Sequence, residues 1–251
     1  MEMPRKADGQ YSVNLEAFEA ALTGRTRIFM LCNPHNPTGR VFRKDELEAM
    51  ADICLKNDII ICSDEIHSDL VFSGNKHIPI ASLSPEIAAK TITLIAPSKT
   101  FNIAGLKASV AIITDEELRK QFDGARKGLT GWVNLLGMVA MEAAYDQGEA
   151  WLDTLLPYLE ANRDYAFDFI NNELPGVKMA KPEGTYLAWL DCQKAEIEGK
   201  PSQFFQEHAK VAMNDGAWFG QGGEGFVRLN FGCPRSMLEE SLDRMKEALT
   251  K

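Results

Sequence analysis

The sequence predicts an α/β fold, in which a large domain with a mainly parallel sheet is followed by a smaller α+β domain. Short apolar runs typical of buried strands alternate with segments of helical spacing in the first half of the chain. After Pro175-Gly176 the pattern changes to a strand pair, a helix, another strand and a closing amphipathic helix. We therefore assign residues 1–150 to the large domain and residues 151–251 to a small C-terminal domain.

The large domain begins with a polar segment in which Asp8-Gly9 predicts a turn. Asn14 is placed to cap a helix over residues 14–22, and a second helix is expected from about residue 44 to 57. The apolar runs that predict buried strands lie at residues 27–32, 59–62, 91–96 and 108–113.

Helical spacing dominates residues 133–174, and breaks are expected near Gly148 and Pro157. The chain shows no internal repeat and no flexible linker. In the small domain we expect strands at 177–180 and 185–191, a helix at 202–211, a strand at 226–231 and a helix at 236–249.

The composition is that of an ordinary globular protein with an acidic balance. The 251 residues carry a formal net charge of −9, which argues against nucleic acid or an anionic membrane as a main partner. The five cysteines are odd in number and form no C-x-x-C pair, which argues against a disulfide framework or a zinc site. Since no apolar run has the length of a membrane span and no secretory signal core is evident, we expect a cytoplasmic protein.

Polar clusters follow the predicted strands, and the first is the loop NPHNPTG at residues 33–39. Its two Asn-Pro steps and its glycine specify a fixed turn. Such a loop can hold an asparagine amide at the carboxyl end of a strand, where open α/β sheets bind ligands. A purely structural turn explains this loop equally well.

The second cluster, SDEIH at residues 63–67, follows the next apolar strand. Asp64 comes first after the apolar run, so it is the acid that we expect to be buried and partnered. One alternative is a metal site formed by Asp64, Glu65 and His67, although no other residues complete a clear ligand set. A solvated loop with a capping aspartate is another alternative.

The last two clusters supply cations. Lys99 follows a strand and has apolar neighbours, which disfavour the ammonium form and suit an amine that forms an imine. An ordinary solvated lysine is the alternative. Arg228 lies inside an otherwise apolar strand and needs an anionic partner, either a bound ligand or a structural ion pair.

Together the clusters supply a carboxylate, an imine-forming amine, an amide and a carboxylate-binding guanidinium. A pyridoxal-phosphate (PLP) enzyme that acts on amino acids needs this set of groups. The aspartate keeps the pyridine nitrogen protonated, so that the ring accepts electrons. The lysine forms the imine and acts as acid and base at the substrate Cα, and the arginine holds the substrate carboxylate.

These motifs resemble the class I/II, fold-type I aminotransferase superfamily, and most closely the MalY/PatB group of cystathionine β-lyase-like C–S lyases. The resemblance covers essentially the whole chain, and it implies a PLP-dependent transferase-like fold. Residues 1–150 would then be the C-terminal part of the PLP-binding large domain. The stretches that carry the resemblance are CNPHNPTGRVF (32–42), SDEIHSDLVF (63–72), PSKTFNIAGLK (97–107), EAAYDQGEAWLDTLLPYLEANRDY (142–165), PEGTYLAWLD (182–191) and RLNFGCPR (228–235).

The resemblance implies roles for four residues around the cofactor ring. Lys99 would carry PLP as a Schiff base, and Asp64 would pair with the pyridine nitrogen. Asn36 would donate a hydrogen bond to the cofactor O3′. His67 stands where many members of the superfamily have a tyrosine near O3′.

Three further residues match positions that hold anionic groups. Ser98 and Lys107 match positions near the cofactor phosphate, and Arg228 matches the clamp for the α-carboxylate of the substrate. The sequence departs from the family at Ala96, where a serine often touches the phosphate. It departs again at Lys107, where an arginine is common, so the charge remains but the bidentate fork is lost.

Family members normally begin well before the NPHNPTG loop. We therefore expect this chain to lack an N-terminal part that carries early strands, the helix end that cradles the phosphate, an aromatic residue on the ring and dimer contacts. Several apolar faces would then lack partners. The resemblance implies a homodimer.

The leading hypothesis is a PLP-dependent carbon–sulfur β-lyase that converts cystathionine, cysteine or a cysteine conjugate to pyruvate, ammonia and a thiol. An aminotransferase uses the same residues and differs by reprotonation at the cofactor C4′ instead of elimination at Cβ. A non-catalytic remnant that keeps the fold but holds no cofactor is the third hypothesis. We expect no metal ion in any of the three.

Overall fold

The computed structural model describes residues 3–250, which form two compact units. The first unit contains residues 14–34 and 41–154, and the second contains residues 3–13, 35–40 and 155–250. The division near residue 154 falls inside the long helix α6 (Glu149–Glu173). The domain boundary at residues 150/151 stays a prediction, because two short segments from the first half of the chain join the second unit.

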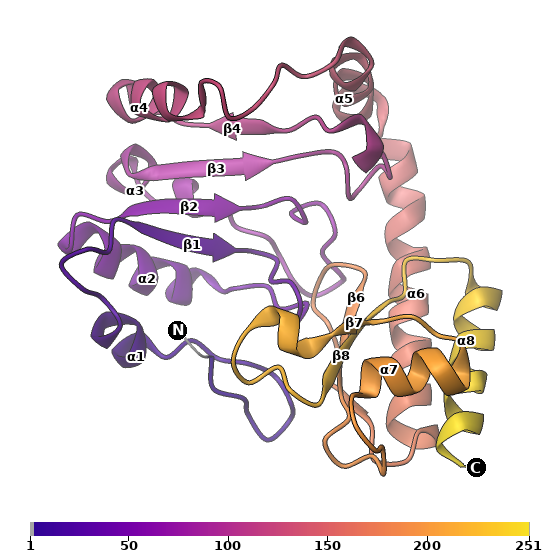
Figure 1. The fold of residues 1–251 in the computed structure, drawn as a ribbon. Helices are drawn as coiled ribbons and strands as arrows, with labels where there is room; N and C mark the ends of the chain where they lie inside the picture. Colours follow the sequence, from indigo (N-terminus) through magenta and orange to yellow (C-terminus); the bar gives the residue numbers. More distant parts are fainter. Residues whose placement is uncertain (1–2, 251) are drawn as a thin grey trace. The chain divides into compact units, whose positions relative to one another are not determined.

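The first unit is built on a four-stranded sheet in the order β1-β2-β3-β4 (Figure 1). β1 (Ile28–Cys32), β2 (Ile60–Asp64) and β3 (Thr91–Ile95) are parallel, whereas β4 (Val110–Ile112) runs antiparallel to β3. All four strands were predicted from apolar runs. Because β1, β2 and β3 are parallel, their carboxyl ends lie at one edge of the sheet.

Helices pack around this sheet and close its core. Asn14 caps α1 as predicted, since its side-chain oxygen accepts a hydrogen bond from the Ala17 amide at 2.9 Å. The buried face of α2 carries Leu47 and Met50, and Ile61 of β2 is fully buried. The helices of this unit are α1 (Leu15–Ala20), α2 (Lys44–Lys56), α3 (Pro85–Ala89), α4 (Glu116–Arg126), α5 (Leu135–Gln147) and the start of α6, with 3-10 turns at Ile80–Ser82 and Ala104–Leu106.

The second unit has an antiparallel sheet in the order β5-β6-β8-β7. Its strands are β5 (Lys178–Met179), β6 (Leu187–Asp191), β7 (Asn214–Asp215) and β8 (Phe226–Asn230). The predicted helix at 202–211 is a short α7 (Pro201–Phe204) that continues as a π-helical turn over Phe205–Ala209, and a 3-10 turn covers Gly216–Phe219. α8 (Arg235–Leu249) closes the chain.

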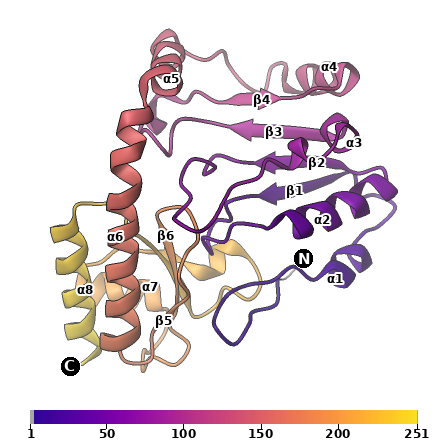
Figure 2. The same cartoon turned by 180° about the vertical axis from the view of Figure 1, so that it is seen from behind.

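α6 and α8 lie side by side (Figure 2), joined by hydrogen bonds from Lys246 Nζ to Glu173 Oε2 at 2.6 Å and from Arg235 Nε to Asn162 Oδ1 at 2.9 Å. The break predicted at Gly148 is confirmed, because α5 ends and α6 begins there. The break predicted at Pro157 is wrong, since α6 continues through it. Proline removes one intrahelical hydrogen bond, and the buried residues beyond it, which include Leu159, Ala166 and Ile170, hold the rest of α6 in place.

None of the helices in residues 3–250 combines the length and the apolar character that crossing a membrane requires.

Candidate functional site

Asp64 is the last residue of β2, at the carboxyl edge of the first sheet. It pairs in register with Cys32 of β1 and with Leu94 of β3. Its side chain is half-buried, and Oδ1 accepts a hydrogen bond from the Ile66 amide at 3.2 Å. The carboxylate is therefore held at the edge where parallel sheets bind ligands.

Lys99 lies in the loop that follows β3, four residues beyond Ile95. The next residue fixes this loop as both donor and acceptor: Thr100 Oγ1 donates to Asp69 Oδ2 at 2.9 Å, and the Thr100 carbonyl accepts from Trp151 Nε1 at 3.2 Å. Asp69 belongs to the loop that begins at Asp64. The loop that carries the amine and the loop that carries the carboxylate are thus bonded to each other at one edge of the sheet.

Three other predicted residues lie on these two loops or just after them. His67 is buried, and its carbonyl accepts a hydrogen bond from the Leu70 amide at 2.9 Å. Ser98 is half-buried beside Lys99. Lys107 is exposed at the end of the 3-10 turn Ala104–Leu106 and has left-handed backbone geometry with a φ of 52°. The first unit therefore gathers the predicted carboxylate, amine and phosphate-binding groups on consecutive loops.

Asn36 and Arg228, the other two predicted residues, both belong to the second unit and are bonded directly. Arg228 lies in β8, where its neighbours in register are Trp189 of β6 and Asn214 of β7. One guanidinium nitrogen, Nη1, donates to Asn36 Oδ1 and the other, Nη2, donates to Asn214 Oδ1, each at 2.7 Å. The guanidinium also lies 4.8 Å from the ring centroid of Phe219.

Arg228 has no carboxylate partner among residues 3–250, so the structural ion pair considered from the sequence is not found there. Its Nε is buried and has no hydrogen-bond acceptor within that part of the chain. Burial lowers the pKa of Arg228 from its ordinary value, and the nearby Tyr186 phenol opposes this effect. Because its partners are neutral amides, the positive charge of the guanidinium is not compensated and can attract an external anion. A carboxylate matches the planar arrangement of its N–H donors.

The loop that carries Asn36 is attached to the second unit through Gly39. The Gly39 carbonyl accepts hydrogen bonds from the Glu183 and Gly184 amides at 2.8 and 2.9 Å. Gly39 has a φ of +70°, and a Cβ there would lie 2.5 Å from the Cβ of Pro182. Only glycine allows this approach. The turn predicted from the sequence is therefore confirmed, and it presents Asn36 to Arg228.

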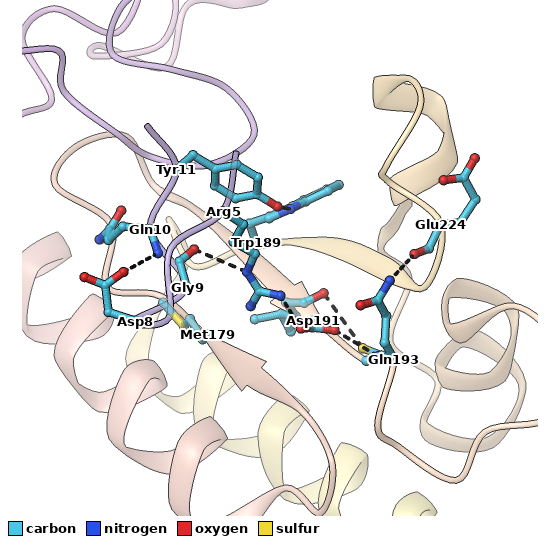
Figure 3. A network of polar contacts seen from close by, with 12 residues as sticks. Arg5, Asp8, Gly9, Gln10, Tyr11, Met179, Trp189, Asp191, Gln193 and Glu224 are labelled. Carbon is cyan, nitrogen blue, oxygen red and sulfur yellow. Dashed lines mark hydrogen bonds and ion pairs between the residues drawn. The ribbon is translucent and has the colours of Figure 1, made fainter. Parts of the chain in front are cut away.

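Figure 3 shows a network that the sequence did not reveal, in which residues 3–13 pack along the second sheet. Arg5 forms an ion pair with Asp191 of β6, and Trp189 Nε1 donates to the Tyr11 hydroxyl at 3.1 Å. Trp189 also stacks on Phe226, with 5.2 Å between ring centroids. Because Trp189 is the register neighbour of Arg228, this network supports the strand that carries the guanidinium.

Other contacts missed from the sequence surround Asp64. Ser63 Oγ and His77 Nε2 lie 2.8 Å from the two carboxylate oxygens of Glu65. Within residues 3–250, no group of three histidine, cysteine or acidic side chains is arranged to hold a metal ion. The Glu65 carboxylate faces Ser63 and His77, as a structural pair would.

Comparisons with known proteins identify the family of the chain. Residues 1–245 match the family model described as aminotransferase class I and II. Over 247 residues, 97% of this chain, the sequence is 44% identical to cystathionine beta-lyase PatB of Bacillus subtilis, and it covers 64% of that protein. It is 38% identical to protein MalY of Escherichia coli over 251 residues, which covers 98% of this chain and 63% of MalY.

Among solved structures, the PLP-bound C-S lyase from Staphylococcus hominis superposes with a TM-score of 0.90 at 37% identity. The match covers 98% of this chain and 63% of the other. The chain thus spans a little under two thirds of the length of these relatives. The architecture is that of the fold-type I, PLP-dependent transferase-like proteins, and the predicted fold class is confirmed. The chain belongs to the aminotransferase class I and II family, and its similarity to PatB and MalY confirms the predicted subgroup.

Proposed function

We propose that this chain carries the catalytic groups of a PLP-dependent carbon–sulfur β-lyase. Its substrate would be cystathionine or a related cysteine derivative, and the products would be pyruvate, ammonia and a thiol. The observation that carries the proposal is the hydrogen bond from Thr100 to Asp69 at 2.9 Å, which joins the loop of Lys99 to the loop of Asp64 at one sheet edge. The names of PatB and of the S. hominis C-S lyase support the choice of reaction.

The residues present fit PLP by the chemistry of their donor set. Asp64 would offer a carboxylate to the pyridine nitrogen, and the Lys99 amine would hold the cofactor covalently. Ser98 and the exposed Lys107 would bind its phosphate. Neither lysine forms an ion pair with the described residues 3–250, so both remain available to an anion or an aldehyde. When bound, PLP supplies an electron sink for the carbanion formed at the substrate Cα.

The chain's own groups would then carry out binding and proton transfer. The buried, unpaired Nε of Arg228 and its amide-held fork favour a bound carboxylate, which would hold the amino acid in register. Lys99 would take the proton from Cα and return a proton where the reaction needs one. Asn36, fixed by Arg228, would donate its amide N–H to the cofactor O3′, and the buried His67 would stand near the same oxygen.

The reaction is tested by incubating a full-length version of the protein with PLP and cystathionine. Pyruvate and free thiol should appear in equal amounts, without any added keto acid. If neither product appears, and amino transfer to an added keto acid takes place instead, the lyase proposal is rejected.

An aminotransferase is the second candidate, because the matching family model is described as aminotransferase class I and II. This reaction would use the same residues, and Lys99 would return the proton to the cofactor instead of assisting elimination. An amino acid added alone to the PLP-loaded chain would then increase the absorbance of the pyridoxamine form. A chain that gains no visible absorption band with PLP would support the third candidate, a non-catalytic remnant.

We also propose that the protein works as a homodimer in the cytoplasm, with residues 1–150 contributing to the PLP-binding domain and residues 151–251 forming the small domain. An apolar segment in the first unit supports association, since Trp132 is 94% and Leu129 is 82% exposed. Leu135 and Leu136 on α5 are also exposed. Sedimentation of a full-length version should give a dimer, and Trp132→Glu should shift it toward the monomer.

A further inference from the structure

Ser63, Glu65 and His77 form a buried hydrogen-bonded cluster next to Asp64, and the proposed reaction does not use it. Ser63 Oγ donates to Glu65 Oε1 at 2.8 Å, and His77 Nε2 lies 2.8 Å from Glu65 Oε2. Ser63 is fully buried, Glu65 is 2% exposed, and only a tenth of the His77 side chain is accessible. All three residues belong to the first unit.

Such a group is unfavourable for folding unless it is satisfied. Removing a carboxylate from water is costly, and a buried ion pair is often no more stabilising than apolar side chains of the same volume. The same space could therefore be filled by hydrophobic residues without loss of stability. The hydrogen-bonded cluster instead fixes positions, because each hydrogen bond holds two side chains at a defined distance and angle.

The fixed positions of Ser63 and Glu65 affect Asp64 because these residues are its two sequence neighbours. Side chains alternate along a strand, so Ser63 faces away from Asp64 on β2, and its hydrogen bond brings the Glu65 carboxylate to the same side. The Ser63–Glu65 hydrogen bond thus links the residues before and after Asp64, on the side opposite the Asp64 side chain. His77 then ties this bridge to the far end of the loop that begins at Asp64.

The main chain around Asp64 is fixed on both sides as well. The Asn33 amide donates to the Asp64 carbonyl at 3.0 Å, and the Glu65 amide donates to the Leu94 carbonyl at 2.9 Å. The carboxylate itself accepts from the Ile66 amide, which is the first residue beyond the bridge. Any shift of Glu65 would be transmitted to that amide and so to the orientation of the carboxylate.

We infer that Glu65 and His77 are positioning residues, which hold the Asp64 carboxylate in the orientation needed by the pyridine nitrogen of PLP. The inference rests on the proposed function where it concerns PLP, but the fixing of Asp64 by Glu65 and His77 can be tested without the cofactor. Two measurements therefore distinguish a failure of this fixing from a failure of the proposed function. One is amide hydrogen exchange at Ile66 without cofactor, and the other is the dissociation constant for PLP.

The decisive variant is His77→Ala, with His77→Gln as its conservative partner, because the glutamine amide can still donate to Glu65. Thr91→Val is the matched control, since it removes a buried hydrogen bond of 2.7 Å to the Ile87 carbonyl at the opposite end of the sheet. His77→Ala should speed exchange at Ile66 at least about tenfold and weaken PLP binding about tenfold, because a small displacement at a site is costly. His77→Gln should restore both to within about threefold, and Thr91→Val should change neither.

The inference is overturned if His77→Ala and Thr91→Val lower the melting temperature equally and leave Ile66 exchange and PLP binding equally unchanged. If His77→Ala does not fold, Ser63→Ala decides in its place, since it breaks the bridge but keeps the Glu65–His77 contact. A wild-type chain that binds no PLP contradicts the proposed function. The exchange rate at Ile66 would still show whether the pair holds Asp64.

Discussion

Arg228 and Lys99, the two cations proposed to bind substrate and cofactor, are held in different ways. Arg228 is fixed by Asn36 and Asn214 at 2.7 Å and by the face of Phe219. Lys99 is half-buried and makes no hydrogen bond or ion pair with the described residues 3–250. The loop around Lys99 is fixed instead, through Thr100.

This difference matches the two proposed tasks. A residue that binds a carboxylate gains affinity from being rigid before the ligand arrives. An amine that must form a covalent bond and move a proton cannot be held by a carboxylate, which would stabilise its ammonium form. Amide partners for the arginine and a fixed loop under the lysine satisfy both requirements.

Replacing Lys99 should have the largest effect of the substitutions proposed here. Lys99→Ala should remove the visible absorption band of PLP and lower the lyase rate at least about a thousandfold, because the proton-transfer group and the covalent link are lost together. Lys90→Ala, at the opposite end of β3, is the control and should keep the band. An active Lys99→Ala protein would disprove the assignment.

Asp64 tests whether the fixed loops serve the chemistry. Asp64→Asn should lower kcat by about a hundredfold or more, because a neutral amide cannot stabilise charge on the pyridine nitrogen. Steady-state kinetics with cystathionine measure this effect. Asp52→Asn, at an exposed position of α2, should leave kcat unchanged. Equal kcat values for the two variants would contradict the role of Asp64.

Arg228→Lys tests whether a rigid guanidinium is needed, because it keeps the positive charge and removes the planar pair of N–H donors. KM should rise about 10- to 100-fold with little change in kcat, since the bidentate contact is lost. Arg235→Lys is the matched control, because Arg235 also bonds an asparagine and lies 4.6 Å from the ring centroid of Tyr165. A KM that is the same in both variants would argue against a substrate contact at Arg228.

The smallest expected effect concerns stability near the Asn36 loop. Burial and then the nearby Arg40 lower the pKa of His35 to about 4. A depressed folded-state pKa stabilises the protein above the ordinary histidine value, and this contribution is lost as the pH falls toward 4. Wild type should therefore lose about 2 kcal/mol more unfolding free energy than His35→Gln between pH 7 and pH 5. Urea unfolding at both pH values measures this difference, and His208→Gln, at an exposed position, serves as control.

Much of the fold could be predicted from local sequence. The apolar run at 27–32 marked β1, and Asn14 before a helical pattern marked α1, because burial and capping are local requirements. The antiparallel direction of β4 could not be predicted, since an apolar run says that a strand is buried but not which way it runs. The break predicted at Pro157 was wrong for a related reason, because contacts with residues distant in sequence, such as those of Asn162 with Phe231 and Arg235, hold α6 in place.

The candidate site shows the same limit. Asp64, Lys99 and Arg228 were conspicuous as polar residues beside or within apolar runs. Asn214 was not, because it lies on a strand of two residues with no periodicity to read. The contact of His77 with Glu65 spans twelve positions of loop, and only the folded chain brings the two together.

The covalent link to Lys99 is the claim on which the rest depends, and one measurement tests it directly. The chain is incubated with PLP, reduced with borohydride and digested with trypsin, and the modified peptide is identified by mass spectrometry. We expect one phosphopyridoxyl group on Lys99, within a peptide of residues 91–107 that trypsin no longer cuts at that lysine. A label found only on Lys107 or another lysine, or no label at all, would contradict it.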